Sequence, residues 1–299
     1  MRFLQVGLGV QGNKRLAIGK KEIIGTVDIN NNKAKYKKIK EVPLDSYDSV
    51  IISVPDNEKF RLIKYALENK KNVMVEKPLW TFKIKDIYKL EKIAHKNNVL
   101  LYVCYNHRFE PHFKTVKKII LSKKIGKIYY CSLFYGNGTA KLVKGSSWKD
   151  KGNGVITDLG SHLLDTINYW FKNNNLKFKL STKSKFENNS TDHAIFHSIN
   201  SEIKFSLEVT LCMWKNTFSC TIIGSKGSVH IDSLCKWGHS TLTLRKRKFP
   251  SGYPKEKVTI IKIKDPTWLK EYNFFKKNIR KKIRTNLEKE IWIYKNLKR

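Results

Sequence analysis

The sequence predicts an α/β protein in which a parallel sheet covered on both faces is followed by a largely antiparallel sheet. In residues 1–104, short strands that are apolar throughout alternate with segments of helical periodicity, as in a sheet with helices on both faces. After residue 105 the strand-like segments follow one another and alternate in polarity, which is typical of an antiparallel sheet. The 299 residues fit two domains, predicted as 1–104 and 105–299.

The elements follow from apolar runs and from the residues that interrupt them. The strands predicted for the first sheet are residues 3–6, 23–27, 50–54, 73–75 and 99–104. Those predicted for the second are residues 127–135, 193–199, 202–211, 218–223, 228–231, 241–245 and 258–263. The Asn- and Lys-rich residues 172–185 are predicted to form a loop and an edge strand, and helices near 268–283 and 287–297 are predicted to close the chain.

The charge is strongly positive, because 60 Lys and Arg outnumber 25 Asp and Glu to give a formal net charge of +35. Only nine of the basic residues are Arg, although Arg dominates base readout and bidentate phosphate contacts. Lys is spread over the whole chain together with frequent Asn and Ile, which all have A/T-rich codons. We therefore favour a solvated lysine surface over a functional field that attracts anions. No nucleic-acid-binding motif is present, so no nucleic-acid partner is predicted.

The cysteines and apolar runs exclude several other classes of protein. The five Cys residues form no C-x-x-C pair, so neither a disulfide framework nor a zinc site is indicated. The first ten residues lack a cleavage-site pattern, and no apolar run approaches the ~18 residues of a membrane span. The expected location is cytoplasmic, without a metal and without membrane association.

A glycine-rich turn near the amino terminus indicates a dinucleotide site. Gly7, Gly9 and Gly12 form G-x-G-x-x-G between a predicted strand and a predicted helix, and Asp28 follows sixteen residues after the last glycine. The glycines allow a tight turn, approach of the backbone to a pyrophosphate and close packing of helix on strand, while the helix N-terminus offers N–H groups. A carboxylate at Asp28 would bind the ribose hydroxyls and repel a 2′-phosphate, which favours NAD over NADP. The alternative is a glycine turn with a surface aspartate.

Three further stretches carry candidate chemistry: Glu76-Lys77-Pro78, residues 105–109 (YNHRF), and residues 154–165 (GVITDLGSHLLD). Lys77 is predicted at the carboxyl end of a parallel strand, where such sheets bind ligands, and an amine there suits proton transfer. Asp158 and His162 are four residues apart, so a helix would place both on one face, where a carboxylate can orient an imidazole. The alternatives are that Lys77 is a surface lysine, that Asp158 caps the helix and that His162 is a core residue.

These stretches, in this order, resemble the Gfo/Idh/MocA oxidoreductases, which include glucose–fructose oxidoreductase and inositol dehydrogenase. The resemblance implies a doubly wound Rossmann domain and a C-terminal α/β domain with an open sheet, through which such proteins commonly form homodimers or homotetramers. It implies Lys77, Asp158 and His162 as catalytic residues and NAD as cofactor, with NADP as the alternative. The implied cofactor-binding residues are Gly7, Gly9, Val10, Gln11, Gly12, Asp28, Ser53, Pro55, Glu76 and Lys77. The implied substrate-binding residues are Asn106, Arg108, Trp148, Lys149, Asp158 and His162, with Arg108 equally a candidate for a structural ion pair.

The chain departs from the family pattern in two places. Asp28 and the strand at Val50 are only about twenty residues apart, which predicts a trimmed adenine pocket with a short helix over residues 33–38. Many members carry a His after the third strand where this chain has Lys59, which would either substitute for it or be solvated.

The activity implied by the resemblance is hydride transfer between a nicotinamide and a secondary alcohol or ketone of a sugar. The Lys-rich residues 141–151 favour a nucleotide-linked or phosphorylated sugar, as in surface-glycan biosynthesis. A free cyclitol or monosaccharide dehydrogenase and a non-catalytic NAD-binding sensor or scaffold are the alternatives.

Overall fold

The chain divides into two compact units. The computed structural model describes residues 1–79, 83–146 and 149–298. The first unit comprises Met1–Asn106 and Thr267–Tyr294, and the second comprises His107–Pro266 and Lys295–Arg299. The break after Asn106 lies two residues beyond the predicted boundary. The helices expected to close the second domain belong to the first unit as far as Tyr294.

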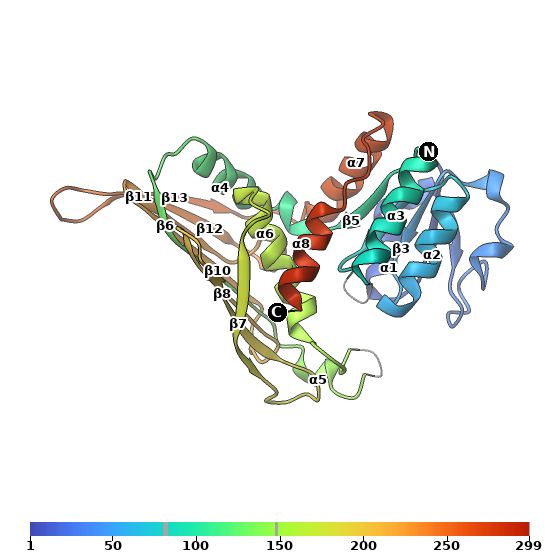
Figure 1. The fold of residues 1–299 in the computed structure, drawn as a ribbon, viewed down its shortest axis with the longest axis horizontal. Helices are drawn as coiled ribbons and strands as arrows, with labels where there is room; N and C mark the ends of the chain where they lie inside the picture. Colours follow the sequence, from blue (N-terminus) through green and yellow to red (C-terminus); the bar gives the residue numbers. More distant parts are fainter. Residues whose placement is uncertain (80–82, 147–148, 299) are drawn as a thin grey trace. The chain divides into compact units, whose positions relative to one another are not determined.

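The first unit is built on a five-stranded parallel sheet (Figure 1). Its strands are β1 (Phe3–Val6), β2 (Ile23–Val27), β3 (Ser49–Ile52), β4 (Asn72–Glu76) and β5 (Leu101–Cys104), in the order β2-β1-β3-β4-β5. Its helices are α1 (Val10–Gly19), α2 (Asp56–Glu68), α3 (Ile84–Lys96), α7 (Thr267–Arg280) and most of α8 (Glu288–Leu297). The strand order reverses between β1 and β3, and such a switch point is where sheets of this kind bind ligands. The predicted parallel Rossmann sheet is confirmed.

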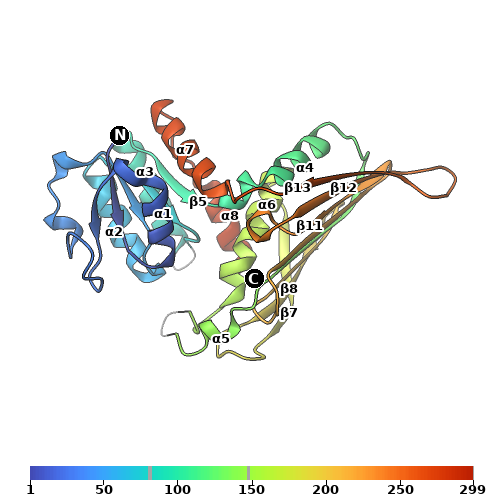
Figure 2. The same cartoon turned by 180° about the vertical axis from the view of Figure 1, so that it is seen from behind.

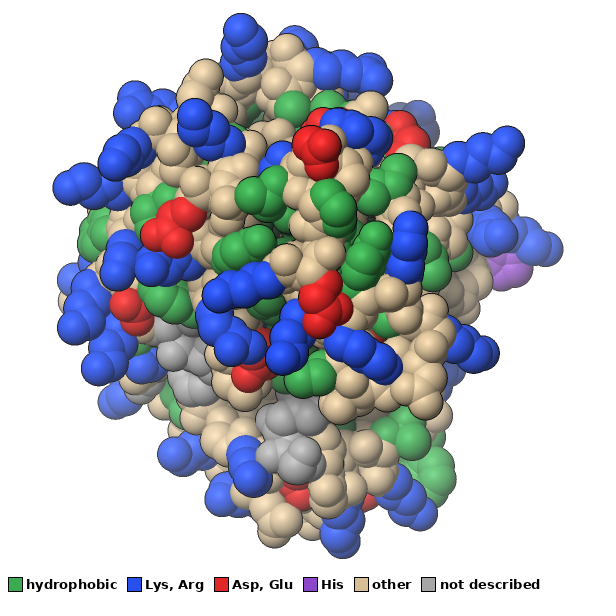
Figure 3. Space-filling model, turned by 90° about the vertical axis from the view of Figure 1, so that its right-hand side faces the viewer, with side chains coloured by type: hydrophobic (Ala, Val, Ile, Leu, Met, Phe, Trp, Pro, Cys, Tyr) green, Lys and Arg blue, Asp and Glu red, His purple; other side chains and the backbone are tan. Residues whose placement is uncertain are grey.

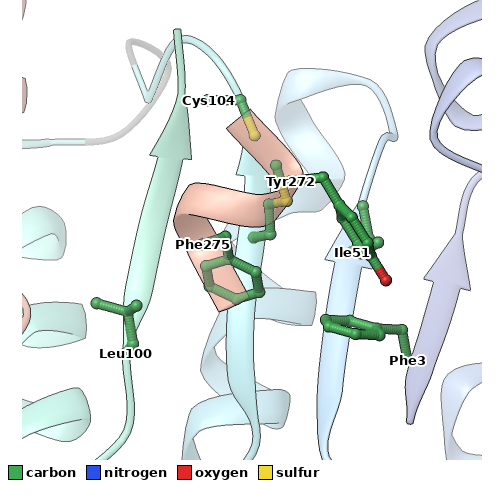
Figure 4. Close-up of a cluster of buried hydrophobic side chains, with 7 residues drawn as sticks. Phe3, Ile51, Leu100, Cys104, Tyr272 and Phe275 are labelled. Carbon is green, nitrogen blue, oxygen red and sulfur yellow. The ribbon is translucent and has the colours of Figure 1, made fainter. Parts of the chain in front are cut away.

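Apolar side chains from the sheet and from α7 form the core of this unit (Figure 4). Phe3 and Met74 are fully buried, and the rings of Tyr272 and Phe275 lie 5.2 and 6.3 Å from that of Phe3. Strands β1 and β3 have no exposed residue, as expected for strands covered on both faces. Helix α7 therefore covers the sheet, although more than 150 residues separate it from β5 in the sequence.

The segment between β2 and β3 contains no helix over residues 33–38, so that prediction is wrong. Tyr36 instead bonds to the end of β2, with its amide donating to Thr26 O at 3.0 Å and its carbonyl accepting from Asp28 N at 3.1 Å. Two 3₁₀ turns, Ile39–Glu41 and Leu44–Ser46, complete the segment. With Lys at 33, 35, 37 and 38, the segment has no apolar stripe to hold a helix against the sheet, and its backbone bonds to the edge strand instead.

The second unit contains an eight-stranded sheet in the order β13-β12-β11-β10-β6-β9-β8-β7. Its strands are β6 (Ile128–Gly136), β7 (Lys177–Ser184), β8 (His193–Ile199), β9 (Lys204–Thr210), β10 (Thr217–Gly224), β11 (Gly227–Asp232), β12 (Ser240–Lys246) and β13 (Lys255–Ile261). Every neighbouring pair is antiparallel except β6 and β9. The mostly antiparallel open sheet is confirmed, and so is the edge strand in residues 172–185, which is β7.

Helices α4 (Pro111–Leu121) and α6 (Ser161–Phe171) lie on one face of this sheet (Figures 1 and 2). They are joined by a hydrogen bond from Trp170 Nε1 to the carbonyl of Phe113 at 3.0 Å. The ring of Phe113 also lies 5.2 Å from that of Phe218 in β10, which ties α4 to the sheet. The short helix α5 (Ala140–Val143) follows β6, and a π-helical turn, Ile156–Gly160, leads directly into α6.

The basic side chains on the face drawn in Figure 3 are dispersed: Lys and Arg are spread among apolar and acidic side chains instead of forming one patch. This distribution agrees with a solvated lysine surface. None of the helices in the described residues is long and apolar enough to span a membrane.

Candidate functional site

The glycine turn sits where β1 meets the switch point of the first sheet. Gly7 has a φ of +88°, and a Cβ there would collide with the carbonyl oxygen of Ser53 at the end of β3. A Cβ on Gly12 would collide with the carbonyl oxygen of Gly7, so this glycine lets α1 approach β1. Gly9 differs, because a Cβ there would meet no atom within 4 Å. Gly7 and Gly12 are therefore required by the fold, whereas Gly9 leaves the backbone open toward a ligand.

The carboxylate of Asp28 is held at the end of β2 by backbone amides. It accepts hydrogen bonds from Leu8 N at 2.7 Å and from the amides of Asn30 and Asn31 at 2.9 Å. Burial opposes its charge, but these bonds hold the pKa of Asp28 below its ordinary value. Asp28 is thus an ionised acceptor fixed beside the glycine turn.

The glycine turn and Asp28 together fit a dinucleotide. Val10 is 73% exposed at the first turn of α1, and Gln11 is also exposed, so the helix N-terminus faces open space. An open N-terminus next to an ionised carboxylate matches a pyrophosphate and a ribose diol.

Lys77 follows β4 at the same edge of the sheet and is held through its backbone by Lys59. The Nζ of Lys59 donates to the carbonyls of Lys77 at 3.0 Å and Pro78 at 3.2 Å, and forms an ion pair of 2.6 Å with Asp56. Lys59 is only 2% exposed, which excludes the solvated alternative. The Lys59 ammonium therefore holds the backbone of the Glu-Lys-Pro turn in place. The Lys77 side chain itself is half-buried.

Glu76 belongs to a buried ionic network that the sequence did not reveal. Arg15 of α1 lies between Glu76 at 2.8 Å and Glu271 of α7 at 2.7 Å, and its guanidinium stacks 4.3 Å from the ring of Trp268. Arg15 and Glu271 are 1% and 0% exposed at the side chain. Burial raises the pKa of Glu271, against the pull of the Arg15 guanidinium. The network links the glycine helix, the Glu-Lys-Pro turn and α7.

Asn106, which was predicted to bind substrate, is buried and is the last residue of the segment Met1–Asn106 in the first unit. Its Nδ2 donates to Thr267 Oγ1 at 2.8 Å, at the start of α7. This bond gives Asn106 a structural role within the first unit.

In the second unit, Asp158 and His162 lie on successive turns of one helical segment. Asp158 is exposed in the π-helical turn and His162 is 8% exposed in the first turn of α6. Asp158 lies inside the helical turn, three residues after Val155 at the N-cap, so it does not cap the helix. The ring of His162 stacks on that of His107, with centroids 4.1 Å apart and planes 20° apart.

Arg108 is engaged by Asp165 of α6. Its Nε and Nη2 each donate to one carboxylate oxygen of Asp165 at 2.7 Å. This bidentate pair matches the structural alternative expected for Arg108. Lys149 is exposed, and Trp148 lies outside the described residues.

A lysine that the sequence did not single out lies beside His107. Lys236 Nζ is 3.2 Å from His107 Nε2 and donates to Tyr135 Oη at 3.1 Å. Burial lowers the pKa of Lys236 to about 8, although Glu110, Asp265 and Asp158 favour its charge. No spacing in the sequence connects Lys236 with residues 107 and 135, and it is one of many lysines. In the described residues no group of three or more His, Cys, Asp or Glu could hold a metal.

Comparison with known proteins places the chain in a family. Residues 2–105 match the family model described as oxidoreductase family, NAD-binding Rossmann fold, and residues 113–230 match that of the GFO/IDH/MocA C-terminal domain. The chain belongs to the GFO/IDH/MocA oxidoreductase family, and its first unit carries the family's NAD-binding Rossmann fold.

Two curated relatives and one solved structure illustrate the likeness. An uncharacterized oxidoreductase of Schizosaccharomyces pombe is 28% identical over 207 residues, which cover 64% of this chain and 55% of the relative. Glucose-6-phosphate 3-dehydrogenase of Bacillus subtilis is 22% identical over 69% of this chain and 65% of its own. The structure of levoglucosan dehydrogenase in complex with NADH superposes with a TM-score of 0.82 at 16% identity, covering 99% of this chain and 94% of that one. The matched part therefore spans only about half the length of the first of these relatives, and the structural likeness shows the fold.

Proposed function

We propose that this protein is an NAD(P)-dependent oxidoreductase that transfers a hydride between the nicotinamide and a secondary alcohol or ketone of a sugar or cyclitol. The observation that carries the proposal is that Gly9, Asp28 and Lys77 lie just beyond the carboxyl ends of β1, β2 and β4, at one edge of a parallel sheet whose strand order reverses between β1 and β3. The names of the similar proteins support it, since they include glucose-6-phosphate 3-dehydrogenase and levoglucosan dehydrogenase.

The side chains near the proposed site suggest which roles belong to the cofactor and which to the protein. When bound, the nicotinamide supplies the hydride chemistry, and the protein supplies proton transfer and orientation. Lys77 and His162 are the proposed acid–base groups for the substrate hydroxyl, and Asp158 the carboxylate that orients substrate or imidazole. Proposed contacts to the cofactor are Gly7, Gly9, Val10, Gln11, Gly12, Asp28, Ser53, Pro55 and Lys77. Glu76 would act by holding Lys77 in place, since Arg15 engages its carboxylate.

A substrate screen tests the proposed activity. Purified protein with NAD⁺ or NADP⁺ is offered neutral sugars, cyclitols, sugar phosphates and nucleotide sugars, and reduced cofactor is followed by absorbance. We expect at least one substrate with turnover that His162→Asn and Asp158→Asn reduce. Cofactor binding without turnover on any of these classes would instead support the sensor or scaffold alternative.

The substrate is further proposed to carry a phosphate or a nucleotide, as a glycan precursor does. The support is three exposed basic residues before the π-helical turn and His162: Lys141 in α5, and Lys144 and Lys149 in the segment that follows α5. Lysines that attract an anionic substrate raise its local concentration, and this effect weakens as salt screens the charges.

The dependence of KM on salt distinguishes an anionic from a neutral substrate. Raising the ionic strength from about 0.01 M to about 0.15 M shortens the screening length from about 30 to about 8 Å. We expect the KM for an anionic substrate to rise roughly fivefold over this range. A neutral sugar turned over by the same protein serves as the control and should show a constant KM. A constant KM for the phosphorylated sugar would rule out electrostatic attraction by the loop.

A further inference from the structure

The second unit contains a polar cluster beside His162 that has no assigned role, the Lys236 cluster, made of Lys236, Tyr135 and His107. Lys236 lies in a 3₁₀ turn between β11 and β12, Tyr135 in β6, and His107 in the turn before α4. Lys236 Nζ lies within hydrogen-bond distance of both His107 Nε2, at 3.2 Å, and Tyr135 Oη, at 3.1 Å. Three separate elements thus converge on one ammonium group.

The contact between Lys236 and His107 fixes the protonation state of the imidazole. An ammonium group has donors and no acceptor, so Nε2 of His107 must offer its lone pair. The ring is then neutral, with its proton on Nδ1. A proton on Nε2 would break this bond and place two cations 3.2 Å apart. Lys236 therefore opposes protonation of His107.

The state of His107 matters for His162 because the two rings are stacked. Their centroids are 4.1 Å apart and nearly parallel, and the ring of Tyr135 lies 5.3 Å from His107 and 6.1 Å from His162. A neutral His107 supports the ring of His162 by stacking, whereas an imidazolium there would repel a second positive charge. A neutral His107 thus makes it easier for His162 to take up a proton than a charged one would.

Several charged groups set the charge of Lys236 itself. The carboxylates of Glu110 from the N-cap of α4, Asp265 from the segment after β13 and Asp158 from the π-helical turn favour the ammonium form, as does Cys235. Burial acts against it and lowers the pKa of Lys236 to about 8. Lys236 is thus charged at neutral pH and loses its proton above about pH 8.

We propose that Lys236 is a positioning residue for His162, which acts by holding the stacked His107 neutral. This inference rests on the proposed function, because it gives His162 the task of exchanging a proton with the substrate. Lys236 itself contacts Tyr135 and His107, and its influence reaches His162 through the second of these rings.

Titration of the histidines by NMR in the protein without ligand tests the inference. The Hε1 resonances of His107 and His162 are assigned with His107→Asn and His162→Asn. In Lys236→Met we expect the pH midpoint at which His107 binds a proton to rise by about one unit, a tenfold gain in proton affinity. Lys236→Arg, which can still donate to Nε2, should restore the original midpoint. Lys179→Met, on the exposed side of β7, removes one positive charge elsewhere in the same unit and should leave it unchanged.

Lys236→Gln is the second variant, since it retains a donor without the charge. We expect a smaller upward shift in this variant, and it keeps the test decisive if Lys236→Met does not fold. An unchanged midpoint of His107 in a folded Lys236 variant would overturn the inference. Because this measurement needs neither cofactor nor substrate, its outcome is independent of the search for a substrate.

The pH dependence of turnover tests whether the cluster serves the reaction. In Lys236→Met we expect kcat to fall more steeply on the acid side, because protonated His107 then competes with His162, while the Kd for NADH is unchanged. If the pH midpoint of His107 shifts in Lys236→Met but the dependence of kcat on pH stays that of the wild type, the positioning role is refuted. If the pH midpoint of His107 shifts in Lys236→Met and the protein turns over no substrate, the proposed function is refuted, whereas the coupling between Lys236 and His107 stands.

Discussion

Replacing Lys77 by Met is expected to abolish turnover while the protein keeps most of its affinity for the cofactor, because the glycine turn and Asp28 are unchanged. Methionine matches the length of the lysine stem but cannot exchange a proton. Loss of a positioned acid–base group typically lowers kcat by about 10²–10⁴-fold. The backbone of Lys77 should stay in place, because Lys59 holds its carbonyl and that of Pro78 and not its side chain. The measurement is kcat, together with the Kd for NADH from fluorescence titration.

Lys85→Met is the matched control for Lys77→Met. Lys85 is exposed on α3 in the same unit, so its replacement changes the charge by the same amount away from the sheet edge. We expect kcat in this control to stay within about twofold of the wild type. Turnover that survives Lys77→Met would show that another group moves the proton.

The second large effect is expected in the buried ionic network of the first unit. Arg15→Met removes the cation between Glu76 and Glu271 and leaves the carboxylate of Glu271, which is 0% exposed, without its charge partner. Breaking one side of a buried ion pair typically costs about 3–5 kcal/mol. We therefore expect the opening free energy of β1 and β4 to fall by that amount. It is measured by hydrogen exchange of their slowest amides, which reports on this unit alone.

Two further variants serve as references for the loss of stability expected in Arg15→Met. Arg2→Met breaks an ion pair whose side chains are 51% and 44% exposed, and should cost less than about 1 kcal/mol. The double variant Arg15→Met/Glu271→Leu removes both buried partners and should recover part of the loss, since apolar replacements can substitute for a buried pair. An Arg15→Met variant no less stable than Arg2→Met would mean that the network contributes little to the fold.

Most of the first sheet could be predicted from the sequence, because its strands are short apolar runs and the first three predicted runs are followed directly by Gly7, Asp28 and Pro55. Strands β1, β2 and β8 have the predicted bounds. The segment after Asp28 was predicted wrongly, because its backbone bonds to the exposed edge of β2 instead of following its own propensity. That contact depends on the tertiary structure.

The local motifs of the candidate site were visible in the sequence, and their supporting residues were not. Gly7, Asp28, Lys77 and His162 lie at the ends of regular elements, where short spacings carry information. Arg15 and Glu271 are 256 residues apart and Lys236 and His107 are 129 apart. A pairing over such a distance leaves no periodicity or spacing in a single sequence. The π-helical turn at Asp158 was also unforeseen, because Gly154 before it and Gly160 at its end do not by themselves indicate a wider helical turn.

Titration of the purified protein with NADH and NADPH, followed by cofactor fluorescence, tests the central claim most directly. We predict saturable binding of NADH, weaker binding of NADPH, and a Kd for NADH that Asp28→Ala raises by about tenfold or more, because a charged hydrogen-bond acceptor is lost. Asp45→Ala, an exposed aspartate in the same segment, should leave the Kd unchanged. Saturable binding of neither cofactor would contradict the account, because the glycine turn and Asp28 would then serve the fold alone.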